Sequence, residues 1–319
     1  MGGVLSGLLS GGAVSGETLA RELGVTRAAV WKQIESLREA GFEIESAGRS
    51  GYRLVSCPDS LLPDFVRHGL STEWVGREIE QYDSLPSTNR LARKRAAEGA
   101  PEGLLILAEE QTEGRGRRGR GWITPPGEAI AMSLLLRPSA HPSRVAALSL
   151  LTALATAEAI EEATGLPARV KWPNDIVIRG RKVVGILLEM DADEESVRSV
   201  VCGVGINVHQ RAFPEELKET ASSLDLLSGR IQSRAAVVRA FLARMEADLR
   251  LPGTEDFLSA YRARSATIGA EVRVISPEES FTGLARDVTE SGSLLVETES
   301  GVREVLAGDV SVRGIMGYA

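Results

Sequence analysis

The spacing of apolar residues changes twice along this chain, and these changes divide it into three units. Up to about residue 60, apolar residues recur at helical spacing. Runs of strand length then alternate irregularly with helical stretches, and near the C-terminus short β-rich segments are separated by glycines. The 319 residues exceed what one hydrophobic core usually serves. We therefore predict an α+β protein with three domains, at residues 1–60, 61–265 and 266–319.

The first unit has the element order of a winged helix-turn-helix. A short amphipathic helix ends at Gly24, and Thr26 is placed to cap a second helix, in which Val30 and Ile34 share one buried face. Two alternating segments around residues 48–51 predict a hairpin, which would be the wing. The candidate DNA contacts on the second helix and at the hairpin tip are Thr26, Arg27, Trp31, Lys32, Arg38 and Arg49.

The charge of this unit leaves two interpretations open. Residues 1–60 hold six basic and seven acidic residues, a net charge of −1, whereas DNA binding draws most of its affinity from neutralised phosphates. Residues 26–38 hold three basic residues and one acidic residue, a net charge of +2 on the helix that would enter the major groove. DNA binding is therefore the favoured function, and docking to another protein is the alternative.

The middle unit begins where Pro58 and Pro63 interrupt both periodicities. A short apolar run is compatible with helix or strand by periodicity alone, and length and flanking turns favour strands. We expect strands at residues 104–108, 131–136, 183–188 and 200–208, and helices at residues 89–98, 144–164 and 235–249. In the last unit, five short strands predict a small barrel, at residues 271–275, 281–288, 294–298, 302–306 and 310–313.

A segment rich in arginine and glycine follows the predicted strand at residues 104–108. Residues 114–122 (GRGRRGRGW) set four arginines among four glycines. Glycines let backbone N–H groups approach a ligand, and guanidinium groups supply fixed positive charge. The segment therefore predicts a mobile, cationic loop that binds an anion, with phosphate as the first candidate. A solvated low-complexity tract is the alternative.

Other polar clusters accompany apolar runs of the middle unit. Residues 83–89 (DSLPSTN) bring hydroxyl and amide groups to a helix start, where a simple N-cap is the alternative. Gln111 at a strand end both donates and accepts, which suits an amide or urea. Residues 171–175 (KWPND) and Lys182 favour a pocket with charge for a carboxylate or phosphate. Residues 203–208 (GVGINV) lack the third glycine and following helix of a dinucleotide-binding motif.

Composition excludes several classes of protein. A net charge of −7 argues against a surface that grips nucleic acid or anionic lipid as a whole. The two cysteines, Cys57 and Cys202, and the scattered His68, His141 and His209 support neither a zinc site nor a disulfide framework. We find no apolar stretch of transmembrane length and no cationic start, so we expect a cytoplasmic protein. The chemistry that remains is phosphoryl or nucleotidyl transfer by positioning.

Read in order, these motifs closely resemble those of bifunctional biotin protein ligases. The resemblance rests on residues 83–89, 114–120, 171–175 and 203–208, with Arg181, Lys182 and Gly185, and it extends from the winged helix to residues 307–313. It implies a central mixed-sheet catalytic domain related to class II aminoacyl-tRNA synthetases and a C-terminal SH3-like β-barrel. It also implies that biotin is activated by ATP with Mg²⁺ to biotinyl-5′-AMP and then passed to a lysine of biotin carboxyl carrier protein.

The resemblance also assigns roles to residues of this chain. Those assigned to biotin are Ser87, Thr88, Asn89, Gln111, Arg115, Gly116, Arg117 and Lys182. Those assigned to catalysis are Lys182, Asp175, which helps to receive the incoming amine, and Arg117. Those assigned to the adenylate and ATP are Arg118, Arg120, Trp122, Lys171, Asn174, Asn207 and Arg313. No metal ligand is implied.

Partners follow from the same resemblance. In this family the adenylate is a corepressor, and a homodimer that holds it presents two recognition helices to operator DNA. The slightly acidic first unit and the aromatic Trp31 on its second helix depart from what a strong DNA binder needs. Two alternatives stay open: a lipoate or octanoate ligase, and a transcription factor that senses biotin without transferring it.

Overall fold

The computed structural model describes residues 3–138, 145–194, 196–251, 254–276, 279–307 and 311–314. The chain forms two compact units, Met1–Leu70 and Ser71–Ala319. The division therefore lies beyond the predicted boundary at residue 60. The central and C-terminal parts of the chain belong to one unit.

The first unit is the predicted winged helix-turn-helix. Its elements are α1 (Val4–Leu9), α2 (Gly16–Leu23), α3 (Arg27–Glu39), β1 (Glu43–Ser46), η1 (Gly48–Ser50), β2 (Tyr52–Ser56) and α4 (Pro63–Arg67). The hydroxyl of Thr26 accepts a hydrogen bond from Ala29 N at 3.2 Å, so the predicted cap of α3 is confirmed. Val30 and Ile34 of α3 are fully buried, also as predicted.

Helix α1 was not expected from the sequence. It has only six residues, and Gly3 at its N-cap offers no side-chain hydrogen bond. Without a cap, and with fewer than two turns, it carries too little periodicity to predict. Val4, Leu5 and Leu8 nevertheless lie buried in the same core as the residues of α3. The winged helix-turn-helix thus begins one helix before the amphipathic helix that the sequence predicts to end at Gly24.

A mixed seven-stranded sheet forms the centre of the second unit. Its strand order is β3 (Ile79–Leu85), β4 (Leu105–Gln111), β5 (Ala129–Leu136), β9 (Val197–Asn207), β8 (Arg181–Ala192), β7 (Asp175–Ile178) and β6 (Arg169–Lys171). The pair β3–β4 is parallel, and the other neighbours are antiparallel. The run at residues 131–136 is a strand, as its length predicts, and every residue of β5 is buried.

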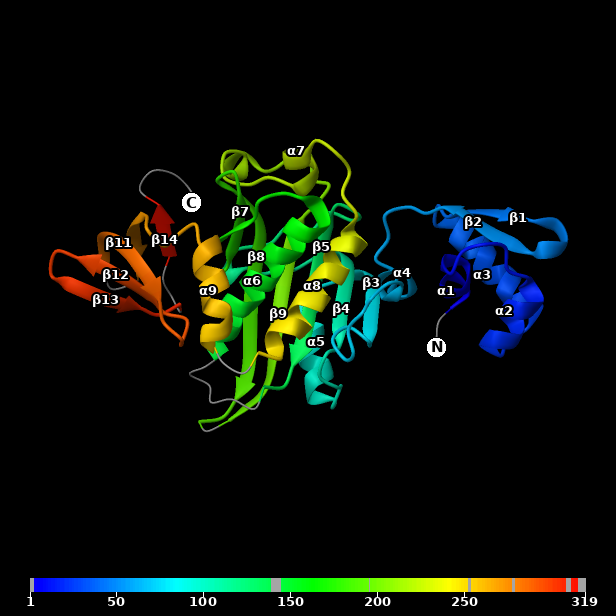
Figure 1. The fold of residues 1–319 in the computed structure, drawn as a ribbon, viewed down its shortest axis with the longest axis horizontal. Helices are drawn as coiled ribbons and strands as arrows, with labels where there is room; N and C mark the ends of the chain where they lie inside the picture. The colour runs from blue at the N-terminus through cyan, green and yellow to red at the C-terminus, as the bar shows by residue number, and fades with distance from the viewer. Residues whose placement is uncertain are drawn as a thin grey trace. The chain divides into compact units, whose positions relative to one another are not determined.

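Helices cover the two faces of this sheet differently. Figure 1 shows α6 (Val145–Thr164) and α8 (Arg234–Leu249) lying side by side over one face, with α9 (Thr254–Arg264) beside them. Successive residues of β9 face opposite sides of the sheet. Cys202 forms a side-chain hydrogen bond with Thr152 of α6, whereas Gly203 faces Asn89 of α5 (Thr88–Ala97). The face opposite α6 is therefore partly free of helices, and a binding site can form there.

The C-terminal strands form an antiparallel sheet. Its order is β13 (Gly301–Val305), β12 (Leu294–Thr298), β11 (Ser280–Val288), β10 (Glu271–Ile275) and β14 (Ser311–Gly314), close to the five predicted strands. This sheet is fastened to the central one through Trp172, whose backbone N–H donates to Thr267 Oγ1 at 2.9 Å and whose indole donates to Gly292 O at 3.1 Å. The fold class predicted from the sequence, α+β with three structural parts, is confirmed.

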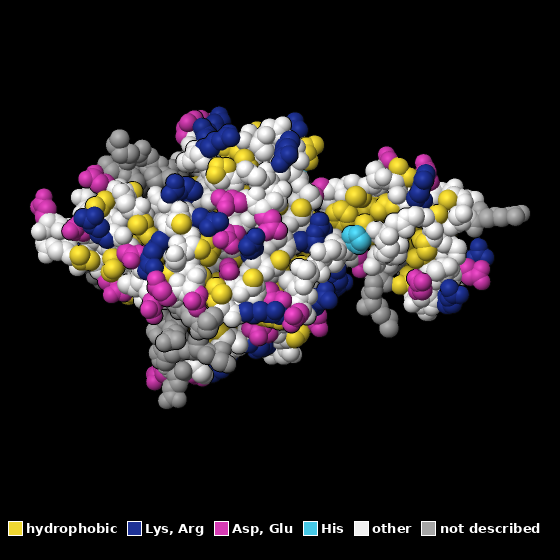
Figure 2. All heavy atoms as spheres, in the orientation of Figure 1, with side chains coloured by type: hydrophobic (Ala, Val, Ile, Leu, Met, Phe, Trp, Pro, Cys, Tyr) yellow, Lys and Arg dark blue, Asp and Glu magenta, His cyan; other side chains and the backbone are white. Residues whose placement is uncertain are grey.

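The surface agrees with the acidic composition. On the face that Figure 2 shows, basic and acidic side chains are interspersed, which gives no extended basic area there. Within the described part of the chain, none of the helices has the length and apolarity needed to cross a membrane.

Candidate active site

A cavity of about 650 Å³ lies on the face of the central sheet that α6 leaves free. Strands β8 and β9 supply its floor through Gly185, Gly203 and Gly205. Almost every predicted site residue of the second unit lines it: Ser87, Thr88, Asn89, Gln111, Arg115, Gly116, Arg117, Arg118, Arg120, Trp122, Lys171, Asn174, Asp175, Lys182 and Asn207. Arg313 lies on β14, but its side chain is outside the described part of the structure.

One end of the cavity is built from the start of α5 and the end of β4. The Ser87 hydroxyl caps α5 by accepting from Arg90 N at 3.4 Å. Gln111 Oε1 accepts from Thr88 N at 2.9 Å and from Thr88 Oγ1 at 3.0 Å. Its Nε2 lies 3.5 Å from Thr124 Oγ1, a long contact that leaves most of its donor capacity for the cavity. This end can bind an amide or urea, as the sequence predicts for Gln111.

The side-chain amide of Asn89 is held by three protein groups. Its Nδ2 donates to Leu187 O at 3.1 Å and to Glu189 Oε2 at 2.8 Å, and its Oδ1 accepts from Ser133 Oγ at 2.6 Å. Gly203 makes room for this amide, because a Cβ there would lie 2.8 Å from Asn89 Cγ. The amide is thus fixed by protein groups on both sides, and the predicted contact between Asn89 and biotin stays a prediction.

Trp122 lies over the middle of the floor. A Cβ on Gly185 would come within 2.9 Å of its Cζ3, and a Cβ on Gly205 within 2.8 Å of its Cζ2. Glycine inside a strand is costly, and here it lets an aromatic ring approach the backbone. The Lys182 ammonium lies 5.7 Å from the ring centroid. The indole N–H is buried and has no hydrogen-bond partner among the described residues.

Residues 114–122 form a small hairpin over the cavity, which we call the lid hairpin. Gly116 N donates to Arg120 O at 2.7 Å, and Trp122 N donates to Gly114 O at 2.9 Å. The sequence predicts a mobile loop here, whereas the structure pairs its two sides, because glycines opposite arginines leave the backbone free to pair. At the tip, Arg118 takes a left-handed conformation with φ of 58°.

The tip of the lid hairpin is held by residues far away in the sequence. Arg117 Nη1 donates to Asn174 Oδ1 at 3.1 Å, and Nη2 donates to the carbonyl of Ala307. Asn174 is itself fixed, because its Nδ2 donates to Ile186 O at 2.7 Å. The predicted loop and the predicted KWPND turn therefore meet, and a carbonyl from the C-terminal part of the chain joins them.

Charged side chains lie close together in and beside the KWPND turn, below the lid hairpin. Lys182 Nζ lies 2.6 Å from Asp175 Oδ1, and both side chains are largely buried. Lys171 is also buried, with 6% of its surface exposed. Cations in such a site act on an anionic ligand more strongly than in water, because the surroundings screen less. The arrangement suits a carboxylate that must approach a phosphate.

At the other end of the cavity, the wall is formed by residues that are hydrogen-bonded to Asn207. Its Nδ2 donates to Ser222 O at 3.1 Å, and its Oδ1 accepts from Gln210 Nε2 at 3.1 Å. Gln210 is 3% exposed, and its Oε1 has no hydrogen-bond partner among the described residues. Gln210 was not predicted as a site residue, since it follows residues 203–208 without any recognisable spacing.

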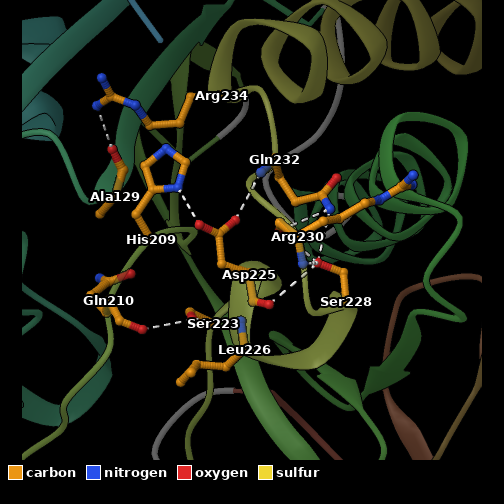
Figure 3. A network of polar contacts seen from close by, with 10 residues as sticks. All are labelled: Ala129, His209, Gln210, Ser223, Asp225, Leu226, Ser228, Arg230, Gln232 and Arg234. Atoms are coloured by element: carbon orange, nitrogen blue, oxygen red, sulfur yellow. Dashed lines mark hydrogen bonds and ion pairs between the residues drawn. The ribbon is translucent and has the colours of Figure 1, made fainter. Parts of the chain in front are cut away.

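A second layer braces this wall, as Figure 3 shows. His209 Nδ1 lies 2.8 Å from Asp225 Oδ2, and Gln232 N donates to Asp225 Oδ1 at 2.8 Å. Ser223 Oγ donates to Gln210 O at 2.7 Å and caps α7 (Leu224–Ser228). The end of β9 and α7 are therefore held together, which fixes the position of Asn207 and Gln210.

Metal-ligating side chains are sparse among the described residues of this cavity. Among the residues that the structure describes, no group of three or more histidine, cysteine, aspartate and glutamate side chains could hold a metal ion. The donor set near the charged centre is one carboxylate, Asp175, already paired with Lys182.

The first unit presents its candidate DNA contacts unequally. Thr26, Arg27 and Lys32 are exposed on or beside α3, and Trp31 is 53% exposed. Arg38 instead braces the wing: its Nε and Nη2 donate to Ile44 O at 3.0 and 2.6 Å, and its Nη1 donates to Glu35 at 2.6 Å. Its guanidinium is thus bonded within the first unit, and a contact between Arg38 and DNA stays a prediction. The side chain of Arg49 lies outside the described part of the structure.

Comparison with known proteins defines the class first. Residues 82–207 match the Biotin/lipoate A/B protein ligase family, residues 6–53 match an HTH domain, and residues 267–313 match the Biotin protein ligase C terminal domain. These ranges coincide with the central sheet, the winged helix-turn-helix and the C-terminal sheet. The class is that of biotin and lipoate ligases with a helix-turn-helix unit.

Similar proteins narrow this class. The chain is 40% identical to the Bifunctional ligase/repressor BirA of Bacillus subtilis over 94% of each chain. It is 30% identical to that of Escherichia coli, over 94% of this chain and 92% of the relative. The solved Biotin protein ligase from Aquifex aeolicus in complex with biotin and ATP has a TM-score of 0.66 at 31% identity, over 75% of this chain and 99% of that one. The chain belongs to the family of bifunctional biotin protein ligases and repressors.

Proposed function

We propose that this protein activates biotin with ATP, forming biotinyl-5′-AMP and pyrophosphate, and then transfers the biotinyl group to a lysine of biotin carboxyl carrier protein. One observation carries the proposal: a single cavity has an end that binds amides, at Thr88 and Gln111, and a cationic centre at Lys182 under the arginines of the lid hairpin. Biotin offers a urea at one end and a carboxylate at the other, so it matches both features of the cavity.

The reaction has two steps. The biotin carboxylate attacks the α-phosphate of ATP, the bond between the α- and β-phosphates breaks, and pyrophosphate leaves. The amine of the carrier lysine then attacks the acyl carbon of biotinyl-5′-AMP, loses its proton, and AMP leaves. The first step brings two anions together, so its barrier falls when fixed cations offset their repulsion.

The shape of the floor orders the ligands. Gly203 and Asn207 are four residues apart on β9, which is about 13 Å at roughly 3.3 Å per residue. In our proposal the urea lies at Thr88, Gln111 and Ser87, beside Gly203. The nucleotide lies toward Asn207, and the reacting carboxylate and phosphate lie between them at Lys182.

The remaining roles follow this order. Arg115, Gly116 and Arg117 close over the acid, while Asp175 orients the incoming lysine amine. The proposed adenylate and ATP contacts are Arg118, Arg120, Trp122, Lys171, Asn174, Asn207 and Arg313. Mg²⁺ enters on the phosphates of ATP, since the cavity offers it no cluster of carboxylates among the described residues.

The experiment is exchange of labelled pyrophosphate into ATP in the presence of biotin. We expect exchange that requires biotin, followed by transfer of labelled biotin to a carrier domain. If exchange were absent, adenylation would be excluded. Lipoate and octanoate should compete poorly with biotin, and strong competition would favour the alternative of a lipoyl or octanoyl ligase.

We further propose that the first unit binds operator DNA and represses biotin-synthesis genes. The exposed Arg27, Trp31 and Lys32 on α3 support this part, as does the HTH match at residues 6–53. In this proposal biotinyl-5′-AMP is the corepressor, and two copies of the chain pair when it is bound. The protein would act in the cytoplasm, with domains near residues 1–60, 61–265 and 266–319. If the protein bound operator DNA but transferred no labelled biotin to a carrier lysine, the alternative of a transcription factor that only senses biotin would be supported.

A further inference from the structure

Ser133 is a polar residue in a strand that is otherwise apolar. Strand β5 reads AIAMSLLL, and all its residues are buried. The Ser133 side chain is fully buried, and a buried hydroxyl is costly unless it is hydrogen-bonded. A hydroxyl kept at this position therefore needs a reason in its contacts.

Those contacts are both at the start of α5. Ser133 Oγ lies 2.8 Å from Thr88 Oγ1 and 2.6 Å from Asn89 Oδ1. Both residues line the cavity, and Ser133 lies one layer behind them. The serine is thus placed to act on a ligand through Thr88 without touching it.

The direction of the hydrogen bonds follows from what each group can donate. The Asn89 amide spends its N–H bonds on Leu187 O and Glu189, so its oxygen must accept from Ser133. With its one proton on Asn89, Ser133 Oγ can only accept from Thr88 Oγ1, so the single Thr88 proton is directed to Ser133 Oγ or to Gln111 Oε1. Every proton in this row is therefore directed toward protein oxygens.

The consequence is a fixed polarity at the cavity wall. The Thr88 hydroxyl proton is already used in a hydrogen bond to the protein, so Thr88 Oγ1 can only accept from a ligand in the cavity. Gln111 instead offers N–H donors from Nε2. An acceptor beside a donor is complementary to one edge of a cyclic urea, where an N–H adjoins a C=O. Threonine in a helix divides between two side-chain rotamers, so something must select the one that faces Gln111.

We propose that Ser133 is the positioning residue that selects this rotamer and thereby makes the site specific for a ligand with an N–H donor beside a carbonyl. This inference rests on the proposed function and adds a determinant of its substrate specificity. Ser133 acts through Thr88, and it takes no part in the transfer of the acyl group.

The test uses the full chain and three variants, Ser133→Ala, Ser133→Thr and Ser199→Ala. Ser199 is a matched control, because it is a buried serine of β9 near the opposite end of that strand from Asn207. Calorimetry gives the Kd of biotin, of ATP and of a biotin analogue in which oxygen replaces one ureido N–H. Two such analogues exist, and the wild type should bind the weaker of them at least about tenfold more weakly than biotin, since the Thr88 acceptor then lacks its donor.

We expect Ser133→Ala to bind biotin about tenfold more weakly and to lose most of its discrimination against the analogue, with the Kd of ATP unchanged. Ser133→Thr keeps the hydroxyl and should retain discrimination, and Ser199→Ala should behave as the wild type. Wild-type discrimination in Ser133→Ala, or equal losses of biotin and ATP affinity, would overturn the inference. Absence of biotin binding to the wild type would instead sink the proposed function.

Discussion

Lys182 is the side chain on which the proposed chemistry most depends. Its ammonium lies 2.6 Å from Asp175, at the centre of the cavity. Lys182→Ala should slow formation of the adenylate by about 10²-fold to 10³-fold, because a charge directed at the reacting phosphate is lost. The measurement is pyrophosphate release in a single turnover.

A control is needed, because the substitution leaves the Asp175 carboxylate without this partner. The double variant Lys182→Ala/Asp175→Asn removes that charge as well and should stay slow. Recovery of the wild-type rate in the double variant, or wild-type rates in the single one, would refute the role of Lys182.

Glu246 is a buried carboxylate whose partners make the stability depend on pH. It accepts hydrogen bonds at 2.8 to 3.0 Å from the backbone N–H groups of Glu73, Trp74 and Val75. Burial alone would raise its pKa, but these bonds and the charge of Arg250 outweigh it, so the pKa of Glu246 lies below its ordinary value. The contribution is therefore complete above the unfolded pKa of about 4.3 and is lost as pH falls through the folded pKa.

Glu246→Gln should consequently destabilise the protein by about 1–3 kcal/mol near neutral pH, because an amide cannot accept all of these bonds. The difference between variant and wild type should shrink at about pH 3. Urea unfolding at both pH values measures it. A difference that does not change with pH would show that the charge of Glu246 does not stabilise the fold.

Single residues were predicted from sequence only where they belong to a motif. The polar residues of the KWPND and GRGRRGR motifs were found because polar density beside apolar strands is visible in the sequence. Ser133 and Gln210 were missed, because one hydroxyl in an apolar run and one amide after a strand carry no spacing signal. The hydrogen-bond partners of Asn89 and Arg38, Leu187 and Ile44, come from other elements and could not be predicted from the local sequence.

At the scale of elements, the lid hairpin depends on a floor without side chains. Gly205→Ala should displace Trp122, because the new Cβ would lie 2.8 Å from Cζ2 of that ring. Alanine is tolerated in a strand, so β9 itself should persist. We expect weaker retention of biotinyl-5′-AMP, by about tenfold or more, measured as its release rate from the preformed complex.

Gly121 is a matched control for this variant. It lies next to Trp122 in the lid hairpin, and a Cβ there would meet nothing within 4 Å. Gly121→Ala should release the adenylate at the wild-type rate. Equal release from wild type and Gly205→Ala would mean that the ring can move aside at no cost, and the floor would then not govern retention.

Elements with clear periodicity or an unbroken apolar run were predicted, whereas several elements without such a pattern were not. Helix α6 and strand β5 were found close to their observed bounds, since twenty and eight residues give clear periodicity or an unbroken apolar run. Helix α7 and strand β6, with five and three residues, were missed. Their conformation is imposed by neighbours, such as Asp225 accepting from Gln232, and local sequence does not encode it.

For the whole molecule, the two compact units predict that DNA binding and catalysis can be changed separately. The double variant Arg27→Ala/Lys32→Ala removes two exposed cations from α3. Affinity for duplex DNA from upstream of biotin-synthesis genes should fall, and the slope of log K against log salt should decrease by about 2. Fluorescence anisotropy at several salt concentrations measures both.

Pyrophosphate exchange by the same variant should equal that of the wild type. Unchanged DNA affinity would point to the alternative function of this unit, docking to another protein. Arg38→Ala is expected to differ from the double variant by loosening the wing, because its guanidinium holds Ile44 O.

The order of the three parts along the chain was readable from periodicity, but their cooperation was not. Nothing in the sequence around residue 117 indicates that its side chain will reach a carbonyl at residue 307. Contacts over such a separation depend on how the C-terminal sheet docks through Trp172, which is a property of the folded unit.

The bond between Arg117 and the Ala307 carbonyl also bears on how the protein can be shortened. The C-terminal sheet resembles a separable appendage, yet it supplies a fastening for the cover of the reaction chamber. We expect a protein trimmed before residue 266 to bind biotin still but to release biotinyl-5′-AMP into water, because Arg117 then lacks its bond to Ala307. Selective transfer to the correct acceptor would therefore depend in part on Ala307, a residue far along the chain from the motifs to which the chemistry is assigned.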